Sequence, residues 1–422
     1  MNSSSFSIKR RAFPVFLSTV VFCSGILCIS TELWAVAGTQ WIAAWAASPQ
    51  SAFPGGDVPP INGQTIRQRM RLSLGGEQLR VRISNEFGNR PLLIGAGSLG
   101  IPKDPSTVVE GTLKKMTFGG RTSILASPGA AVISDPVDLP VKTGGEVCIS
   151  LYLPEKVQSP TLHSVGLKTA VFTPPGDFTG QTHVETAAST TAAVFVSALM
   201  VPKPEDAGLI VALGDSITDG TTTTVDSDGS WPAVLARRLA ANGMTLAVVN
   251  QGISGNQLRH DGAGVSALAR FDRDVLAMPG VTHLIVLIGI NDIGWPGAKM
   301  GGMLLADPAL TPTAEDLIGA YQQLIARARM HGIKIIGATL TPFGGTDVPG
   351  YYSESKESIR AAVNKWIRSS GAFDAVIDFD AALRDPAKPE QVRRDCVSKD
   401  NIHPNDKGHR VMADSINLQL LK

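Results

Sequence analysis

The spacing of apolar residues changes near residues 201–206, and this change most constrains the fold. Before it, as in residues 66–74, apolar side chains alternate with polar ones, which predicts strands with one buried face. After it, short apolar runs alternate with amphipathic helical patterns, which predicts a parallel sheet with helices on both faces. Residues 201–206 contain two prolines and three charged residues, typical of a linker. We therefore expect an accessory domain over 38–200 and a second domain over 208–422.

The accessory domain is expected to be all β. Gly75-Gly76 separates two alternating runs and predicts a hairpin, and further glycine and proline breaks divide the region without a long helical pattern. A β-sandwich-like architecture fits this organisation. Residues 95–100 have the glycine spacing of a dinucleotide-binding turn, but Pro102 and Pro105 follow where that motif needs a helix. We expect no nucleotide site there.

The second domain is expected to be α/β. Its apolar runs predict strands that are buried on both faces, and the segments between them predict amphipathic helices. Ligands of such sheets bind at the carboxyl ends of the strands. The expected strands are 209–213, 246–250, 283–288, 334–340 and 375–379, and the expected helices are 231–241, 263–278, 313–330, 354–369 and 405–421.

The N-terminus has the features of an export signal. Three basic residues at 9–11 precede an apolar run over about 12–30, and Ala35-Val36-Ala37 offers small residues for cleavage. We expect a signal peptide over 1–37, a secreted or periplasmic protein, and no stable membrane span after cleavage.

Export permits disulfides, so Cys148 and Cys396 form either a bridge or two separate buried thiols. The net charge of +1 comes without a basic stripe, which argues against a nucleic-acid partner.

Polar and small residues follow three consecutive strands of the predicted parallel sheet. The segments are 214–220 (Gly-Asp-Ser-Ile-Thr-Asp-Gly), 250–256 (Asn-Gln-Gly-Ile-Ser-Gly-Asn) and 289–292 (Gly-Ile-Asn-Asp). A serine at such a turn can expose its hydroxyl to a substrate carbonyl. Near the C-terminus, Asp400 precedes His403 by three residues, so one local turn lets the carboxylate hold the imidazole.

These four blocks, in this order and spacing, resemble the signature of the GDSL/SGNH hydrolases, over about residues 208–422. Ile217 replaces the leucine of the family's usual motif. The resemblance implies a flavodoxin-like three-layer α/β/α domain and a serine esterase that needs no metal or organic cofactor. It also implies that Ser216 is the nucleophile, His403 the base and Asp400 its orienting partner. The oxyanion hole would consist of the Ser216 and Gly252 N–H groups and the Asn291 side chain.

Other hydrolase designs fit less well. Thr218 stands where a nucleophile elbow needs its second glycine, and no His-Glu-x-x-His zinc motif is present. Three functions stay open. The first is hydrolysis of short-acyl esters, including acetyl groups on a polysaccharide, with small-molecule or polysaccharide esters as partners. The second is a lipase, lysophospholipase or acyltransferase with the same site, and the third is a non-catalytic binding protein.

Several further residues have two interpretations. Asp215 and Asp292 are expected to fix loops, and His409 to be a surface or capping residue. Trp231 and the insertion over 293–312 are candidates for the wall of the substrate pocket. The alternative for the insertion is an adaptable surface loop. Aromatic residues near the mature N-terminus favour a packed core or a domain interface over a glycan-binding platform; they are Trp41, Trp45 and Phe53.

Overall fold

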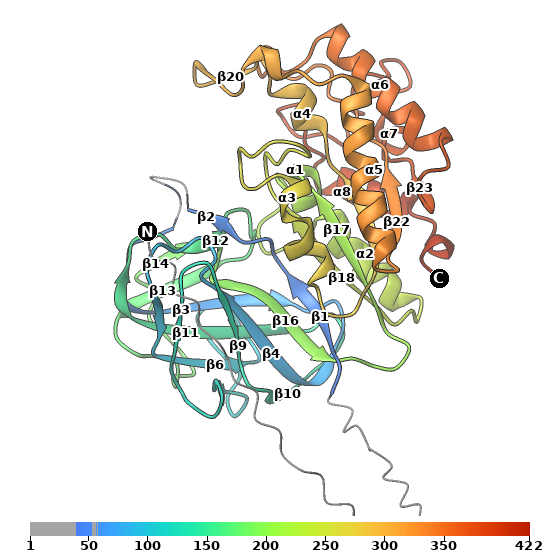
Figure 1. Ribbon diagram of the computed structural model, residues 1–422. Helices are drawn as coiled ribbons and strands as arrows, with labels where there is room; N and C mark the ends of the chain where they lie inside the picture. Colours follow the sequence, from blue (N-terminus) through green and yellow to red (C-terminus); the bar gives the residue numbers. More distant parts are fainter. Residues whose placement is uncertain (1–38, 53–55, 57) are drawn as a thin grey trace, which may run out of the picture. The chain divides into compact units, whose positions relative to one another are not determined.

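The computed structural model describes residues 39–52, 56 and 58–422. Residues 39–422 belong to one compact unit. The expected signal peptide over 1–37 and Phe53 lie outside the described residues. The architecture changes from β to α/β between strands β16 (Val196–Pro202) and β17 (Gly208–Gly214) (Figure 1).

The region before β17 consists mainly of antiparallel sheets, which confirms the expected β architecture. One sheet has the order β1-β16-β4-β10, with β9 also paired to β4, and the other has the order β14-β13-β3-β11-β6-β7. Three short strands form a third sheet, β15-β12-β2. The bounds are β1 Trp41–Ala46, β2 Gln50–Ser51, β3 Ile61–Arg71, β4 Gly76–Ser84, β6 Ala96–Gly100, β7 Lys114–Lys115, β9 Ala131–Ile133, β10 Val137–Val141, β11 Glu146–Val157, β12 Thr161–His163, β13 Ala170–Pro175, β14 Ala188–Thr190 and β15 Ala193–Val194.

The hairpin predicted around Gly75-Gly76 is wrong. Strands β3 and β4 flank this turn but belong to different sheets, where β3 pairs with β11 and β13, and β4 pairs with β16, β10 and β9. A side chain on Gly75 would lie 2.4 Å from the Val141 carbonyl oxygen, so the glycine permits a tight crossing. The alternation correctly gives each strand a buried face, but it does not specify the pairing partner.

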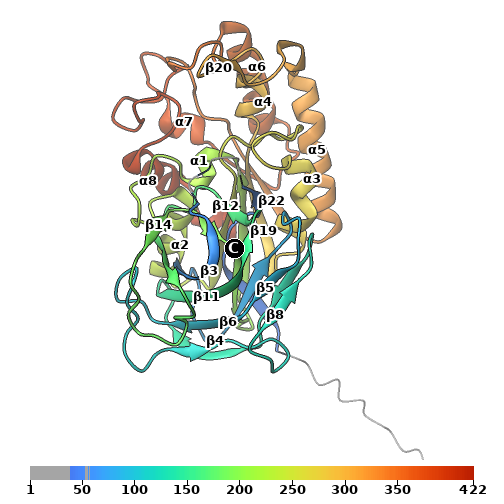
Figure 2. The same cartoon turned by 90° about the vertical axis from the view of Figure 1, so that its left-hand side faces the viewer.

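The α/β region has a five-stranded parallel sheet in the order β18-β17-β19-β22-β23. With strands numbered along the chain this order is 2-1-3-4-5, which confirms the flavodoxin-like expectation. Figure 2 shows α3 and α5 on one side of the sheet and α2, α7 and α8 on the other. The bounds are β18 Leu246–Gly252, β19 Val281–Leu287, β22 Lys334–Ala338, β23 Ala375–Ile377, α1 Ser216–Asp219, α2 Trp231–Ala241, α3 Ala267–Phe271, α4 Ile290–Gly294, α5 Ala314–Met330, α6 Glu354–Ser369, α7 Phe379–Leu383 and α8 Asp406–Ser415.

Two predicted helices are shorter than expected. The segment 263–278 forms α3 followed by a π-helix over Asp272–Leu276. The segment 405–421 breaks after α8, because Ile416 is extended and the Asn417 side chain caps a separate 3-10 helix over Leu418–Leu421. By contrast, α5 begins as predicted, with a reciprocal capping box between Thr313 and Asp316.

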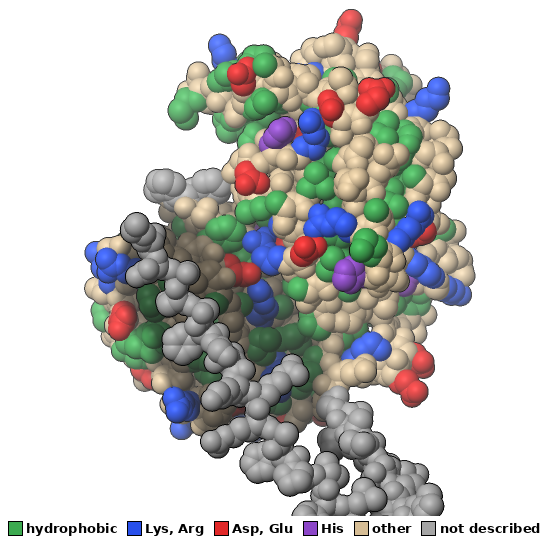
Figure 3. Space-filling view, in the orientation of Figure 1, with side chains coloured by type: hydrophobic (Ala, Val, Ile, Leu, Met, Phe, Trp, Pro, Cys, Tyr) green, Lys and Arg blue, Asp and Glu red, His purple; other side chains and the backbone are tan. Residues whose placement is uncertain are grey.

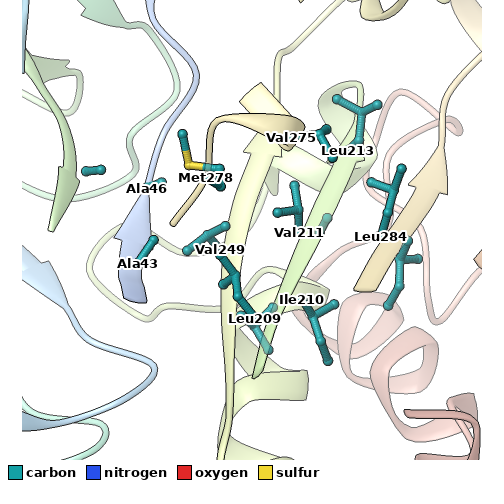
Figure 4. Packing of buried hydrophobic residues seen from close by; sticks show 14 of the residues in the cluster. Ala43, Ala46, Leu209, Ile210, Val211, Leu213, Val249, Val275, Met278 and Leu284 are labelled. Atoms are coloured by element: carbon teal, nitrogen blue, oxygen red, sulfur yellow. The ribbon is translucent and has the colours of Figure 1, made fainter. Parts of the chain in front are cut away.

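Strand β1 links the two regions. Its Ala43 N–H donates to the Pro279 carbonyl at 3.0 Å, and the strand lies against β18. Figure 4 shows Ala43 and Ala46 beside Val249 and Met278 in a continuous apolar cluster. Burial of apolar surface therefore stabilises the β and α/β regions together.

Cys148 and Cys396 are free and buried, so the structure matches the alternative of separate thiols. Burial raises the pKa of the Cys148 thiol to about 12.

On the face shown in Figure 3, acidic and basic side chains are interspersed rather than gathered by sign.

Candidate active site

Ser216, His403 and Asp400 form one hydrogen-bonded chain. His403 Nε2 lies 2.8 Å from Ser216 Oγ, and His403 Nδ1 lies 2.6 Å from Asp400 Oδ2. Because a carboxylate can only accept, Nδ1 carries the proton and Nε2 is free to accept the serine proton. The structure thus brings together three residues that are 187 positions apart at the widest pair, Ser216 and His403.

A tight turn holds Asp400 against the histidine. Asp400 Oδ1 accepts the N–H groups of Ile402 and His403 at 2.9 and 3.0 Å. Asn401, between Asp400 and Ile402, has φ 57°, a left-handed conformation that asparagine tolerates better than most residues. Partial burial would raise the pKa of Asp400, but the His403 ring and the two N–H donors outweigh it and hold this pKa below its usual range. The carboxylate therefore stays ionised.

Ser216 is the first residue of α1, directly after β17. Asp215 caps this short helix by accepting the Ile217 N–H at 3.0 Å. A side chain on Gly214 would lie 2.1 Å from Thr218 Oγ1, so only glycine lets the helix fold back onto the end of its own strand. The Ser216 N–H has no acceptor among the described residues, which leaves it available as an oxyanion donor.

Gly252 does not have the geometry expected of an oxyanion donor. Its N–H already donates to Asn250 Oδ1 at 2.9 Å. The absence of a side chain matters instead, because a Cβ there would lie 2.3 Å from the Asp219 N and push α1 away. Gly255 is the better candidate: it has φ 76°, and its N–H has no partner within the part of the chain that the structure describes. We infer that Gly255 supplies the second backbone donor.

Asn291 lies on α4, which follows β19 at the same edge of the sheet as Ser216. Its Nδ2 donates to the Asn256 carbonyl at 2.9 Å, which leaves the second hydrogen of that amide for a ligand. Its Oδ1 accepts the hydroxyl of the buried Tyr351 at 2.8 Å. Tyr351 thereby fixes which end of the amide faces the site. No sequence pattern indicates a role for this tyrosine, because it lies 60 residues from Asn291 on an irregular loop.

The comparison with protein families matches this geometry. Residues 212–411 match the model of the GDSL-like Lipase/Acylhydrolase family. These residues form a GDSL-like lipase/acylhydrolase domain. The match includes α1, the segments 250–256 and 289–292, and the Asp400–His403 turn. Together with the serine–histidine pair, it identifies a serine ester hydrolase.

Solved structures similar to the GDSL-like domain cover about half of the chain. A putative lipolytic protein of the G-D-S-L family from Desulfitobacterium hafniense is 22% identical, with 49% of this chain and 96% of that chain covered and a TM-score of 0.37. An acetylxylan esterase from Geobacillus stearothermophilus is 21% identical (51% and 94% covered, TM-score 0.38). The aryl esterase of M. smegmatis is 16% identical (51% and 98% covered, TM-score 0.39). No curated protein matched.

Two buried carboxyl groups support the loops of the GDSL-like domain, as predicted. Asp292 accepts the N–H groups of Leu258 and Arg259 at 2.7 and 3.0 Å. Burial raises the pKa of Asp292 to about 6, and burial raises that of Asp215 to about 7 although the Ile217 N–H opposes the change. Both residues therefore give the folded protein a greater proton affinity than the unfolded chain has.

Replacing Asp215 with asparagine should stabilise the protein at pH 8 and have less effect at pH 5. The folded-state pKa lies above the unfolded value, so the folded protein binds the extra proton between about pH 4 and 7, and stability falls as pH rises through that range. Asparagine is neutral and also caps helices well. We expect a gain on the order of 1 kcal/mol at pH 8, measured by urea unfolding at both pH values. The exposed Asp138→Asn is the control, and an equal gain at the two pH values would contradict the prediction.

Two sequence expectations about the surroundings of the site are corrected. Trp231 is fully buried and packs on Phe379, with ring centroids 5.3 Å apart, so it does not wall a pocket. His409 is fully buried rather than on the surface, and its Nδ1 accepts the backbone N–H of Trp231 at 3.3 Å. Burial, with a smaller effect from His403, lowers the pKa of His409 to about 4, which keeps it neutral. Neither residue type indicates from sequence whether it is buried, and in the structure both side chains lie in the core.

The insertion over 293–312 contributes to the site and to the surface. Trp295 lies so close to Gly255 that a side chain on that glycine would meet the indole at 2.8 Å. Residues 299–304 of the insertion form the exposed hairpin β20–β21 (Lys299–Met300 and Met303–Leu304), which projects in Figure 1. Trp295 therefore lies beside the candidate oxyanion donor Gly255, and the hairpin supports the surface-loop interpretation.

The described residues contain neither a membrane-spanning helix nor a metal-binding cluster. No helix there is long and apolar enough to cross a membrane. No group of three or more His, Cys, Asp and Glu side chains there has an arrangement that could hold a metal ion.

Proposed function

We propose that the protein is an exported carboxylic ester hydrolase that acts on short-acyl esters, among them O-acetyl groups of polysaccharides, through an acyl-enzyme on Ser216. The observation that carries the proposal is the unbroken chain from Ser216 Oγ through His403 to Asp400. The small-residue site Ala35-Val36-Ala37 supports export into the periplasm or the medium.

The proposed reaction has two halves. Ser216 Oγ attacks the acyl carbon while His403 Nε2 takes the hydroxyl proton, and the same proton then goes to the departing alkoxide. Water attacks the resulting acyl-serine with His403 again as the base, which releases the acid and restores the serine. The developing oxyanion would accept hydrogen bonds from the N–H groups of Ser216 and Gly255 and from the Asn291 amide.

The surroundings of the serine support a small acyl group. Trp295 lies against Gly255, and the ring of Tyr351 fills the space where a side chain on Gly294 would be, at 2.3 Å. Bulky aromatic side chains thus border the candidate oxyanion donors and limit the room beside them. Side chains of Asp400 and His403 are 31% and 20% exposed, so a polymeric leaving group can approach from solvent.

One observation favours a second candidate, hydrolysis of longer acyl chains. The hairpin β20–β21 exposes three large apolar side chains, Met300 at 59%, Met303 at 74% and Leu304 at 50%. Clustered exposed apolar residues are typical of surfaces that contact lipids or proteins. A lipase or an acyltransferase with the same triad would use such a surface.

The test is a series of p-nitrophenyl esters from acetate to palmitate, with the purified mature protein. The short-acyl proposal expects the highest kcat/KM with acetate or butyrate, a burst of one p-nitrophenol per Ser216 when deacylation is slow, and release of acetate from acetylated xylan. An optimum at octanoate or longer would favour the second candidate. A folded wild type that cleaves none of the esters would contradict both.

A further inference from the structure

A buried histidine of the β region reaches the nucleophile helix. His163, at the end of β12, is 5% exposed, and its Nε2 lies 2.8 Å from Asp219 Oδ1. Its Nδ1 lies 3.1 Å from the Ser48 carbonyl oxygen, also in the β region. This pair is separate from the Ser216–His403–Asp400 chain and has no part in the proton transfers described above.

The two partners of His163 determine its protonation. A backbone carbonyl and a carboxylate both only accept hydrogen bonds, so both ring nitrogens of His163 must donate. The ring is therefore an imidazolium paired with the Asp219 carboxylate. Burial alone would lower the pKa of His163, but Asp219 and the two hydrogen bonds outweigh it and the pKa is raised.

Asp219 connects this imidazolium to both sides of the oxyanion site. It is the last residue of α1, the one-turn helix that Ser216 begins. Its Oδ2 accepts both the N–H and the hydroxyl of Ser254 at 2.9 Å, and Ser254 immediately precedes Gly255. One carboxylate thus spans the nucleophile helix and the turn with the second candidate donor, and His163 holds that carboxylate from the β region.

We propose that His163 is a positioning residue for ester hydrolysis, fixing through Asp219 the relative placement of Ser216 and Gly255. This inference rests on the proposed function. It also gives the β region a catalytic task, because the donors of an oxyanion hole act only when held in place before the reaction. A displacement of about 1 Å can cost roughly 10²-fold in rate.

The test compares His163→Ala with two further variants. Asp219→Asn is the conservative variant: its amide oxygen can accept from Ser254, and its NH₂ can donate to a neutral His163 that keeps its bond to Ser48. His183→Ala is the matched control, because His183 is an exposed histidine of the same region that contacts Thr107. His163 and Asp219 also border a cavity of about 290 Å³, so solvent can reach Asp219 when the ring is removed and the variant can fold.

We expect His163→Ala to lower kcat for p-nitrophenyl acetate roughly 10- to 100-fold, with KM changed less than about threefold. Asp219→Asn should lose clearly less, and His183→Ala should stay within about twofold of wild type. Amide hydrogen exchange should quicken in residues 216–221 and 253–256 of His163→Ala and not of His183→Ala.

Three results would overturn the proposal. One is a folded His163→Ala protein with wild-type kcat, and another is unchanged exchange in the two segments. The third is a loss of kcat that only follows the unfolded fraction, measured by circular dichroism. An inactive wild type would contradict the proposed function alone, because the exchange measurement would still decide whether His163 positions the two segments.

Discussion

Ser216→Ala is expected to lower kcat/KM for p-nitrophenyl acetate by at least about 10⁴-fold while leaving the fold intact. The hydroxyl lies 2.8 Å from His403 Nε2, and the variant removes only this oxygen. Truncation therefore deletes the nucleophile without opening a large cavity. Residual hydrolysis would come from the oxyanion donors and from bound water.

The matched control is Ser415→Ala on α8, an exposed serine whose hydroxyl donates to the Met412 carbonyl at 2.7 Å. It should keep wild-type activity. His403→Ala should approach the loss of Ser216→Ala, and the double variant should lose little more, because residues that act as a unit are not additive. A Ser216→Ala protein with more than a tenth of wild-type activity would remove Ser216 from the mechanism.

Arg270→Met should be the most destabilising of the substitutions considered, by about 3–5 kcal/mol. The Arg270 guanidinium is fully buried and pairs with Asp274 at 2.9 Å. It also donates to the carbonyls of Gly214 and Gln251 at 2.9 and 2.7 Å, which precede the turns that contain Ser216 and Gly255. A further bond goes to the Ser48 hydroxyl at 2.7 Å. Removing it takes a donor from the buried carbonyls of Gly214 and Gln251, and it takes one of two arginine partners from Asp274, which keeps Arg273 at 2.5 Å.

Urea unfolding of Arg270→Met beside Arg329→Ala would test this expectation. Arg329 is half exposed and pairs with Asp374 at 2.8 Å, so its loss should cost less than about 1 kcal/mol. If the two variants lost equal stability, the network around Arg270 would not be a major source of stability. A folded Arg270→Met protein should also have lower esterase activity, because Gly214 and Gln251 support the turns on either side of the serine.

Catalytic residues within recognisable motifs could be predicted from the sequence, whereas residues that act only by holding other groups in place could not. Ser216, Asp400 and His403 lie in short motifs, and the resemblance of the four blocks to the GDSL/SGNH signature implied their roles. Gly252 and Gly255 look alike in sequence, and only the hydrogen bond from Gly252 to Asn250 separates a packing glycine from a candidate donor. Periodicity likewise gave the parallel sheet, because strands buried on both faces are nearly all apolar.

His163, Tyr351 and Arg270 had no comparable signal. Each is a single polar residue in an ordinary stretch, and its role comes from partners far along the chain, such as the 56 positions between His163 and Asp219. The failed hairpin at Gly75-Gly76 has the same cause. Local patterns determine which face of an element is buried, whereas long-range packing determines what covers it.

The pairing of β1 with β16 has a consequence for how the chain folds. The first described strand finds its neighbour only when residues 196–202 have been synthesised, immediately before the strand that leads to the serine. Contacts between such distant segments slow folding. A nascent chain that stops short of β16 would leave β1 with an open hydrogen-bonding edge, the kind of edge that recruits other chains and causes aggregation.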